Sequence, residues 1–336
     1  MTPLAGLAPD GIASALGLEP AFRGRQVFRW IHRGAETFDA MSDLPADLRS
    51  ALEERASILT SRVDTRSASG DGSVKLRIRL ADGAAIEAMS LQDGRGRRTA
   101  CLSTQAGCAM GCAFCRTGLM GLVRDLAAHE IVEQLMHLRR ETGDIGNIVF
   151  MGMGEPLRNF EPVAAAVGVF AHADGPGMSL RRITISTCGI VEGIQRLADE
   201  GPAVRLAVSL ISAVPDTRSS LMTVNRANPL PALREALGAY QERTRRRITL
   251  EVVLIDGVTD RAGDAEALVE WAGPLGVMVN LIPWNPVPEI DFRESPPQRV
   301  RWFKERLEAA GLLVAERLRK GRSVNGACGQ LAILEG

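Results

Sequence analysis

The spacing of hydrophobic residues predicts helices at the start of the chain. Within residues 23–34, Val27, Phe28 and Ile31 fall on one helical face, while arginines spaced four residues apart occupy another. Residues 1–55 continue in this style, so we expect an N-terminal helical domain there. Its arginines either form a solvated face or contact a nucleic acid.

Alternating side chains follow the helical segment. Residues 72–91 alternate in places between apolar and polar side chains around an Asp-Gly pair at residues 82 and 83. Such a pair between alternating segments is a strong signal for a β-hairpin. We therefore expect a short β extension over residues 56–93, which links the helical domain to the rest of the chain.

Strands and helices alternate regularly from about residue 98 onward. Short apolar runs predict strands over residues 98–104, 147–153, 181–187, 204–210, 247–255 and 277–283. Amphipathic segments predict helices over residues 126–142, 191–200, 231–245, 265–273 and 296–311, and a further short apolar run covers residues 312–318. This alternation is typical of parallel β/α packing, and six repeats fall short of the eight in a complete barrel. We expect an α/β fold built on a partial (β/α)6 barrel, in a core domain over residues 94–336.

Charge and hydropathy narrow the class of protein. The 336 residues include 40 Lys and Arg and 40 Asp and Glu, so no overall charge attracts the chain to nucleic acid. Basic runs at residues 94–98, 243–247 and 317–322 still allow local contacts with phosphates. The first residues do not resemble a signal peptide, and no window of about eighteen residues is apolar enough for a membrane span. We expect a cytoplasmic protein with no membrane contact.

Four of the six cysteines lie between residues 101 and 115. In a reducing compartment, such clustering indicates metal binding or catalysis rather than structural disulfides. Cys108, Cys112 and Cys115 have the spacing C-x3-C-x2-C. Three thiolates can hold a [4Fe–4S] cluster while one iron stays open to an outside ligand. A closed zinc site is the alternative, but it needs four ligands, and Cys101 lies on a predicted strand.

Glycines and polar residues stand at the ends of several predicted strands. One strand ends in Gly154 and Glu155, whose carboxylate can accept hydrogen bonds from an ammonium group. Ser186, Ser209 and Asn285 end three other strands. Because parallel strands place their carboxyl ends at one edge, where β/α folds bind ligands, these residues can converge on one ligand.

The motifs of the chain resemble those of a known family. The cysteine spacing, followed by a helix and a Gly-Glu strand end, is typical of the radical S-adenosylmethionine superfamily. Nearly the whole chain resembles the RlmN/Cfr-type RNA methyltransferases, through residues 22–54, 101–118, 150–157, 185–190, 218–226, 281–286 and 327–331, which occur in the family's order. The cysteine spacing alone indicates the superfamily, whereas the terminal Ala-Cys-Gly-Gln-Leu segment together with Cys101 indicates this branch.

This resemblance implies an enzyme that methylates an adenine carbon in RNA. The usual product carries the methyl group on C2 of an adenosine in 23S ribosomal RNA, with tRNA as a second substrate and C8 as a rarer position. In the family's scheme, one S-adenosylmethionine methylates a cysteine and a second is cleaved to a deoxyadenosyl radical, which takes hydrogen from that methyl group. The new radical adds to an adenine carbon, which is a poor nucleophile. A second cysteine then releases the product by forming a disulfide with the first.

The resemblance also implies cofactors, partners and residue roles. It implies one [4Fe–4S] cluster, two S-adenosylmethionine molecules per turnover, an electron donor such as flavodoxin, and a monomeric enzyme. Cys328 matches the methyl-carrying cysteine, Cys101 the resolving cysteine and Glu87 the proton acceptor. The cluster ligands would be Cys108, Cys112 and Cys115, and the S-adenosylmethionine contacts Gly154, Glu155, Ser186, Ser209, Leu210, Ile211 and Asn285. The chain departs from the family's pattern at Ile211, where a polar residue is usual, and at Arg322 and Ser323, where acids are usual.

Other classes of protein fit part of this pattern. A methylthiotransferase on the same barrel would use a second cysteine cluster, and too few cysteines are left once Cys101 and Cys328 are assigned. A non-catalytic iron–sulfur or zinc module that binds RNA would need neither the Gly-Glu ligand site nor Cys328. A radical enzyme that acts on another RNA or on a protein also stays open.

Overall fold

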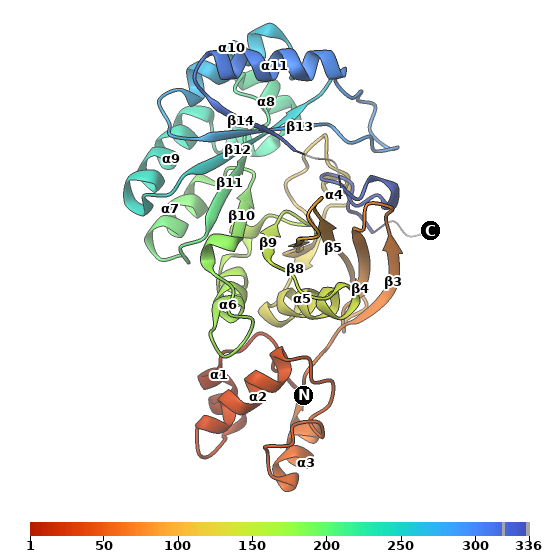
Figure 1. The fold of residues 1–336 in the computed structure, drawn as a ribbon. Coiled ribbons are helices and arrows are strands. Elements are labelled where there is room, and N and C mark those ends of the chain that lie inside the picture. The colour runs from red at the N-terminus through yellow and green to blue at the C-terminus, as the bar shows by residue number, and fades with distance from the viewer. Residues whose placement is uncertain (318–319, 334–336) are drawn as a thin grey trace.

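A ten-stranded sheet forms the centre of the computed structural model, which describes residues 1–317 and 320–333 (Figure 1). The strands lie in the order β14-β13-β12-β11-β10-β9-β6-β5-β4-β3. Neighbours from β6 to β14 are parallel, and β5, β4 and β3 continue the sheet as antiparallel strands. The strands are β3 (Arg62–Ala68), β4 (Val74–Arg79), β5 (Ala85–Gln92), β6 (Arg98–Cys101), β9 (Asn147–Phe150), β10 (Ile183–Thr187), β11 (Arg205–Ser209), β12 (Ile248–Leu254), β13 (Met278–Pro283) and β14 (Leu313–Glu316).

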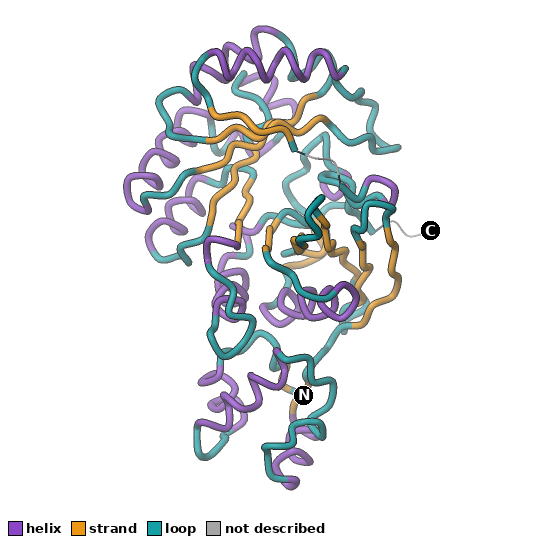
Figure 2. Tube along the Cα trace, in the orientation of Figure 1, coloured by secondary structure: helices purple, strands orange, loops and turns teal. Residues whose placement is uncertain are grey.

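The parallel part of the sheet confirms the predicted β/α fold. The six predicted strands correspond to β6 and β9–β13, and β14 adds a parallel strand at the edge. Leu318, at the end of the predicted run 312–318, lies outside the described residues. The sheet is curved, and helices cover its outer side (Figure 2). The connecting helices are α5 (Ala128–Thr142), α6 (Phe160–Ala171), α7 (Val191–Asp199), α8 (Pro215–Leu221), α9 (Leu230–Thr244), α10 (Ala262–Ala272) and α11 (Pro297–Ala309).

Helices α6 and α8 were not predicted from the sequence. Residues 160–171 include one charged side chain, Glu161, so they lack the polar face by which an amphipathic helix is recognised. Helix α8 spans only seven residues, which is too short for a clear period. No helix in the described part of the chain has the length and apolar character needed to cross a bilayer.

Three helices form the N-terminal segment, as predicted: α1 (Pro9–Leu16), α2 (Phe22–His32) and α3 (Ala46–Arg55). The short strands β1 (Thr2–Pro3) and β2 (Ala56–Ser57) pair in parallel and close it. The predicted apolar face of α2 is fully buried. Arg25 and Arg29 on its other side both contact Asp174, at 3.2 and 2.8 Å, so these arginines hold α2 against the loop after α6.

The β extension is continuous with the central sheet. Strands β4 and β5 form the predicted hairpin around residues 82 and 83, and β5 pairs with β6. Strand β3, which pairs with β4, was not predicted because its residues are mostly polar and exposed. The antiparallel strands therefore extend the barrel sheet rather than forming a separate linker.

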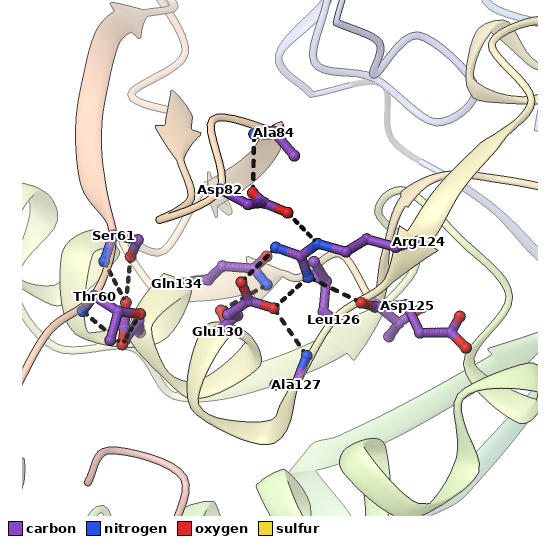
Figure 3. A network of polar contacts seen from close by, with 12 residues as sticks. Thr60, Ser61, Asp82, Ala84, Arg124, Asp125, Leu126, Ala127, Glu130 and Gln134 are labelled. Carbon is purple, nitrogen blue, oxygen red and sulfur yellow. Dashed lines mark hydrogen bonds and ion pairs between the residues drawn. The ribbon is translucent and has the colours of Figure 1, made fainter. Parts of the chain in front are cut away.

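A second small sheet lies against this region and is tied down by ion pairs. It consists of β7 (Gln105–Gly107) and β8 (Leu122–Asp125), and α4 (Arg116–Leu119) lies between them in sequence. Arg124 on β8 donates hydrogen bonds to Asp82 in the β4–β5 turn, at 2.5 Å, and to Glu130 at the start of α5, at 2.7 Å (Figure 3). Glu130 also accepts a hydrogen bond from the Ala127 amide. The network joins β8, α5 and the hairpin.

We predict that Glu133→Ala loosens the join between β2, β3 and α5. The buried Glu133 carboxylate accepts hydrogen bonds from the backbone N–H and the hydroxyl of both Thr60 and Ser61. A buried donor left without its partner costs roughly 1–3 kcal/mol. Amide hydrogen exchange in residues 58–68 should become about 10–100-fold faster. Glu54→Ala, an exposed change on α3, is the control, and equal exchange in both variants would contradict the prediction.

Candidate active site at the carboxyl ends of the strands

A cavity lies at the carboxyl ends of β9–β13 and gathers most of the predicted site residues. Because the parallel strands end at the same edge, residues far apart in sequence share its wall. The predicted residues that line it are Cys108, Cys112, Cys115, Gly154, Glu155, Ser186, Ser209, Ile211, Asn285 and Cys328. Ten residues that were singled out from the sequence or from its family resemblance therefore meet around one space.

Three predicted residues lie away from that wall. Leu210 is fully buried behind it, and its carbonyl accepts a hydrogen bond from the Arg218 guanidinium at 3.0 Å. Cys101, at the end of β6, lines a smaller neighbouring cavity together with Cys328. Glu87 on β5 lies beneath the C-terminal tail, where its two carboxylate oxygens contact the Lys75 ammonium at 2.8 Å and the Ala332 amide at 3.1 Å.

The loop with Cys108, Cys112 and Cys115 is closed by backbone hydrogen bonds. The Cys108 amide donates to the Gly121 carbonyl at 2.8 Å, and the Cys115 amide donates to the Cys112 carbonyl at 3.1 Å. Burial raises the pKa of all three thiols, that of Cys108 to about 11, and repulsion from neighbouring cysteines, which for Cys115 is Cys328, adds to the shift.

These three thiols fit an iron–sulfur cluster. Within residues 1–317 and 320–333, no three His, Cys, Asp or Glu side chains gather around a point that would suit a single ion. A cubane differs because its protein ligands bind separate irons, and soft thiolates suit it. Bound metal also supplies the positive charge that buried thiolates need. Cys101, the fourth ligand required by the zinc alternative, lines the other cavity.

Backbone amides from two different loops position the Glu155 side chain. Its carboxylate accepts hydrogen bonds from the Cys188 amide at 2.7 Å and the Leu157 amide at 3.1 Å, and the side chains of Cys188 and Thr187 also lie against it. Burial raises the pKa of the carboxyl group. The preceding Gly154 has φ +101°, and a Cβ there would lie 2.6 Å from the Gln105 side chain. Only glycine fits this approach, so the Gly-Glu pair is a local requirement of the site.

Two features of the cavity wall are suited to bind a polar ligand. The buried Oδ1 atom of Asn285 has no hydrogen-bond partner in the described structure, which leaves an acceptor open toward the cavity. Ile211 adopts φ +66°, which is rare for a β-branched residue and costs free energy. Its amide donates to the Glu251 carbonyl at 3.1 Å. An unpaired acceptor and a strained turn at one cavity are typical of a binding site.

The C-terminal tail brings Cys328 into the cavity through contacts on both sides. The Arg116 amide donates to the Gly329 carbonyl at 2.8 Å, and Asn285 Nδ2 donates to the Cys328 carbonyl at 3.1 Å. The Thr117 hydroxyl donates to the Leu331 carbonyl at 2.6 Å. Cys328 and Cys101 are both free thiols in this structure.

The residues that depart from the family's pattern fasten the start of the tail. Arg322 lies 3.4 Å from Glu294, and the Ser323 hydroxyl lies 2.8 Å from the Ser69 hydroxyl in the β3–β4 turn. The adjacent Gly321 amide donates to Asp71 at 3.0 Å. These contacts lie in and beside η4 (Arg322–Val324), the 3-10 turn that leads to Cys328. The tail is therefore attached to the β extension as well as to the barrel.

Sequence reasoning missed the buried Arg218, which supports two walls of the cavity. Its guanidinium donates to the Leu210 carbonyl after β11, to the Cys188 carbonyl after β10 at 2.8 Å, and to Asn225 Oδ1 at 2.7 Å. Arg218 and Asn225 both belong to the segment 218–226, which was recognised only as part of the family resemblance. An arginine and an asparagine seven residues apart carry no signal of their own, because the pair forms across α8 and η3 (Thr223–Arg226).

Comparisons with known proteins identify the family. Residues 102–272 match the Radical SAM superfamily, and residues 14–58 match the ribosomal RNA large subunit methyltransferase N-terminal domain. The chain is 47% identical to the probable dual-specificity RNA methyltransferase RlmN of Moorella thermoacetica, an alignment that covers 98% of this chain and 96% of that protein. The chain belongs to the RlmN family. A second RlmN relative, from Treponema denticola, is 44% identical with 98% and 95% of the two chains covered.

A solved structure agrees with this RlmN assignment. The crystal structure of a radical SAM methyltransferase from Sphaerobacter thermophilus matches with a TM-score of 0.93 and 40% identity, and covers 98% of this chain and 99% of that one. The radical SAM fold of an RlmN protein implies a [4Fe–4S] cluster and S-adenosylmethionine. Among the described residues, the cavity with three thiols at the strand ends is suited to both.

We predict that Arg218→Met weakens S-adenosylmethionine binding at least about tenfold. The change leaves buried carbonyls after β10 and β11 unpaired, which costs roughly 1–3 kcal/mol, and both loops carry cavity residues. Isothermal titration of the reconstituted protein measures the dissociation constant, and circular dichroism checks the fold. Arg226→Met, an exposed change in the same segment, is the control. Equal dissociation constants in the two variants would show that Arg218 does not support the site.

Proposed function

We propose that this RlmN-family protein, a radical S-adenosylmethionine RNA methyltransferase, places a methyl group on C2 of an adenosine in 23S ribosomal RNA and also acts on tRNA. One observation carries this proposal: the C-terminal tail places Cys328 in the same cavity as the three clustered cysteines. A radical enzyme without a methyl-carrying cysteine would not need this tail. Mass spectrometry of the modified nucleoside distinguishes C2 from C8 methylation.

Cys108, Cys112 and Cys115 would hold the cluster, with one iron left for S-adenosylmethionine. The cluster would supply the electron that cleaves this cofactor and generates the radical. Glu155 would accept hydrogen bonds from its ammonium group, Ser186 and Ser209 would contact its polar groups, and Asn285 Oδ1 would accept a further hydrogen bond. Gly154 provides the close approach, and at Leu210 and Ile211 the contacts would come from the backbone.

The reactive cysteines have separate tasks in this proposal. Cys328 takes a methyl group from one S-adenosylmethionine, and a second molecule is consumed in each turnover. Once the former methyl carbon joins the Cys328 sulfur to adenine, the Cys101 thiolate attacks that sulfur. The carbon–sulfur bond breaks with its electron pair on the methylene carbon, which takes up a proton to become the methyl group of the product, and a sulfur–sulfur bond forms between Cys101 and Cys328. Glu87 would accept the proton lost from the adenine carbon, and the shared cavity of Cys101 and Cys328 supports the pairing.

The basic runs predicted from the sequence are partly neutralised within the protein. Arg97 pairs with Asp93 at 2.7 Å, Arg243 with Asp199 at 2.8 Å, and Arg322 with Glu294. Arg319, in the run 317–322, lies outside the described residues. These runs are therefore weaker candidates for RNA contact than their composition indicates.

A groove lined by arginines lies at the amino-terminal ends of the parallel strands, opposite the cavity. Arg181 and Arg182 in η2 (Leu180–Arg182), Arg205 at the start of β11 and Arg139 on α5 line it. In the described part of the chain these arginines have no ion-pair partner, whereas the adjacent Arg140 lies 3.5 Å from Glu36. Arg139 is partly buried and lies close to the Asp144 carboxylate, whereas Arg181, Arg182 and Arg205 are exposed. Three exposed guanidinium groups in one groove suit RNA phosphates.

We propose that RNA contacts this groove together with the helical domain over residues 1–55. The match of residues 14–58 to an N-terminal domain of ribosomal RNA methyltransferases supports this division, with residues 56–93 as the β extension and 94–336 as the catalytic core. We further propose that the enzyme is a monomer and acts in the cytoplasm, where an RNA substrate of this kind occurs.

We predict that the two reactive cysteines give different variants. Cys328→Ala should acquire no methyl group and make no product. Cys101→Ala should methylate Cys328, react with RNA and stop there, because no thiolate resolves the adduct. Nuclease digestion and mass spectrometry of protein purified from cells detect the attached nucleotide. Cys188→Ala, a third cysteine change, is the control for folding. Full turnover in Cys101→Ala, or an adduct in Cys328→Ala, would reverse the roles.

We predict that Arg181→Glu with Arg182→Glu weakens RNA binding through phosphate contacts. Losing two contacts lowers the slope of log affinity against log salt by about 2, since each contact contributes about 0.9. Filter binding of a ribosomal RNA fragment between 50 and 300 mM salt measures this slope. Arg301→Glu with Arg306→Glu, two exposed arginines on α11, has the same change in charge and is the control. An unchanged slope would remove the groove from the RNA interface.

A further inference from the structure

An exposed apolar tip lies between α4 and β8. Leu119, Leu122 and Val123 are 54%, 43% and 67% exposed, although they lie within five consecutive residues. Isolated exposed apolar residues are common, but a contiguous group marks an interaction surface. All three side chains are aliphatic, whereas single-stranded RNA prefers aromatic and arginine platforms. The tip is therefore better suited to a protein than to RNA.

This tip is joined directly to two proposed cluster ligands. Helix α4 begins at the residue after Cys115, and the Gly118 amide donates to the Cys115 carbonyl at 3.0 Å. The Gly121 carbonyl, at the turn of the tip, accepts a hydrogen bond from the Cys108 amide at 2.8 Å. A short chain of covalent and hydrogen bonds thus connects the exposed tip to both ends of the cysteine loop.

The tip is held in place from the β8 side. Arg124 connects β8 to Asp82 and Glu130, as described above (Figure 3). Gly107 packs so closely on the tip that a Cβ there would lie 2.0 Å from the Gly121 carbonyl oxygen. Because these contacts come from different elements of the fold, they fix the position of the backbone that carries the apolar side chains.

The groove beside the tip contains three arginines, one of which has no ion-pair partner among the described residues. Its charged lining residues are Arg77, Arg79, Arg116 and Glu289. Arg116 pairs with Glu289 at 2.5 Å, and Arg79 pairs with Asp64 at 2.7 Å. The buried Nε of Arg77 has no hydrogen-bond partner in the described structure. An apolar centre beside the unpaired Arg77 is complementary to a protein surface that presents a carboxylate next to an apolar contact.

We propose that this tip and groove form the docking surface for a small acidic protein that carries one electron to the cluster. The proposal rests on the proposed function, in which Cys108, Cys112 and Cys115 hold a [4Fe–4S] cluster. In the step, the carrier is oxidised by one electron and the cluster is reduced by one. The hydrogen bonds at Cys115 and Gly121 connect the tip directly to the loop of the proposed cluster ligands.

The test compares a protein donor with a small chemical one. In Leu119→Glu with Val123→Glu, repulsion and lost apolar contact should slow reduction of the reconstituted cluster by photoreduced flavodoxin at least about tenfold. Dithionite, which needs no docking surface, should reduce the cluster within about twofold of the wild-type rate. Stopped-flow bleaching of the cluster absorbance measures both rates. Leu313→Glu, an equally exposed leucine on β14, is the control.

Arg77→Gln provides a second, milder variant. It should weaken flavodoxin binding, measured by titration, and reduce its dependence on salt, because one charge of the groove is lost. If the double variant loses its cluster, the Arg77→Gln variant still tests whether flavodoxin docks at this surface. Unchanged reduction by flavodoxin overturns the proposal, and so does a loss of RNA affinity in the double variant with normal reduction. If wild-type protein reduced by dithionite methylates no RNA, the proposed function fails, while the comparison of donors still reports on docking.

Discussion

The hydrogen bond from the Arg116 amide to the Gly329 carbonyl joins the two parts of the chain on which the chemistry depends. Arg116 follows Cys115 and Gly329 follows Cys328, so this contact sets where the reactive tail lies relative to the cysteine loop. Ordering a chain end costs conformational entropy. Hydrogen bonds between the tail and Asn285, Thr117 and Glu87 offset this cost. Residues 320–333 of the tail therefore have a defined place although they form no strand of the sheet.

The parallel sheet provides the rigid edge against which that tail docks. Its strands end together, and the loops after them carry small, polar or strained residues instead of core residues. Arg218 joins two of these loops by hydrogen bonds, and Ile211 has an unfavourable backbone angle beside them. Such features persist only where the surrounding packing enforces them, as it does here.

Several parts of the molecule could not be inferred from local patterns. The sequence did not predict α6, because a helix buried on most sides has no polar face, or β3, because its exposed residues do not alternate. The arginines of α2 were predicted to face solvent or nucleic acid, yet two of them pair with Asp174, more than a hundred residues away. Glu87 and Leu210 were placed in the site by resemblance, and the structure has them outside the wall of the main cavity.

The sequence by itself determined the alternation of strands and helices, the spacing of the three clustered cysteines and the residues that end each strand. These are local properties, since periodicity and spacing act over a few residues. Only the tertiary structure decided that Arg218 braces two loops, that Leu210 lies behind the cavity wall, and that Leu119, Leu122 and Val123 face outward. Each of these depends on which distant segments pack together, and packing between distant segments leaves no pattern in any one stretch of the chain.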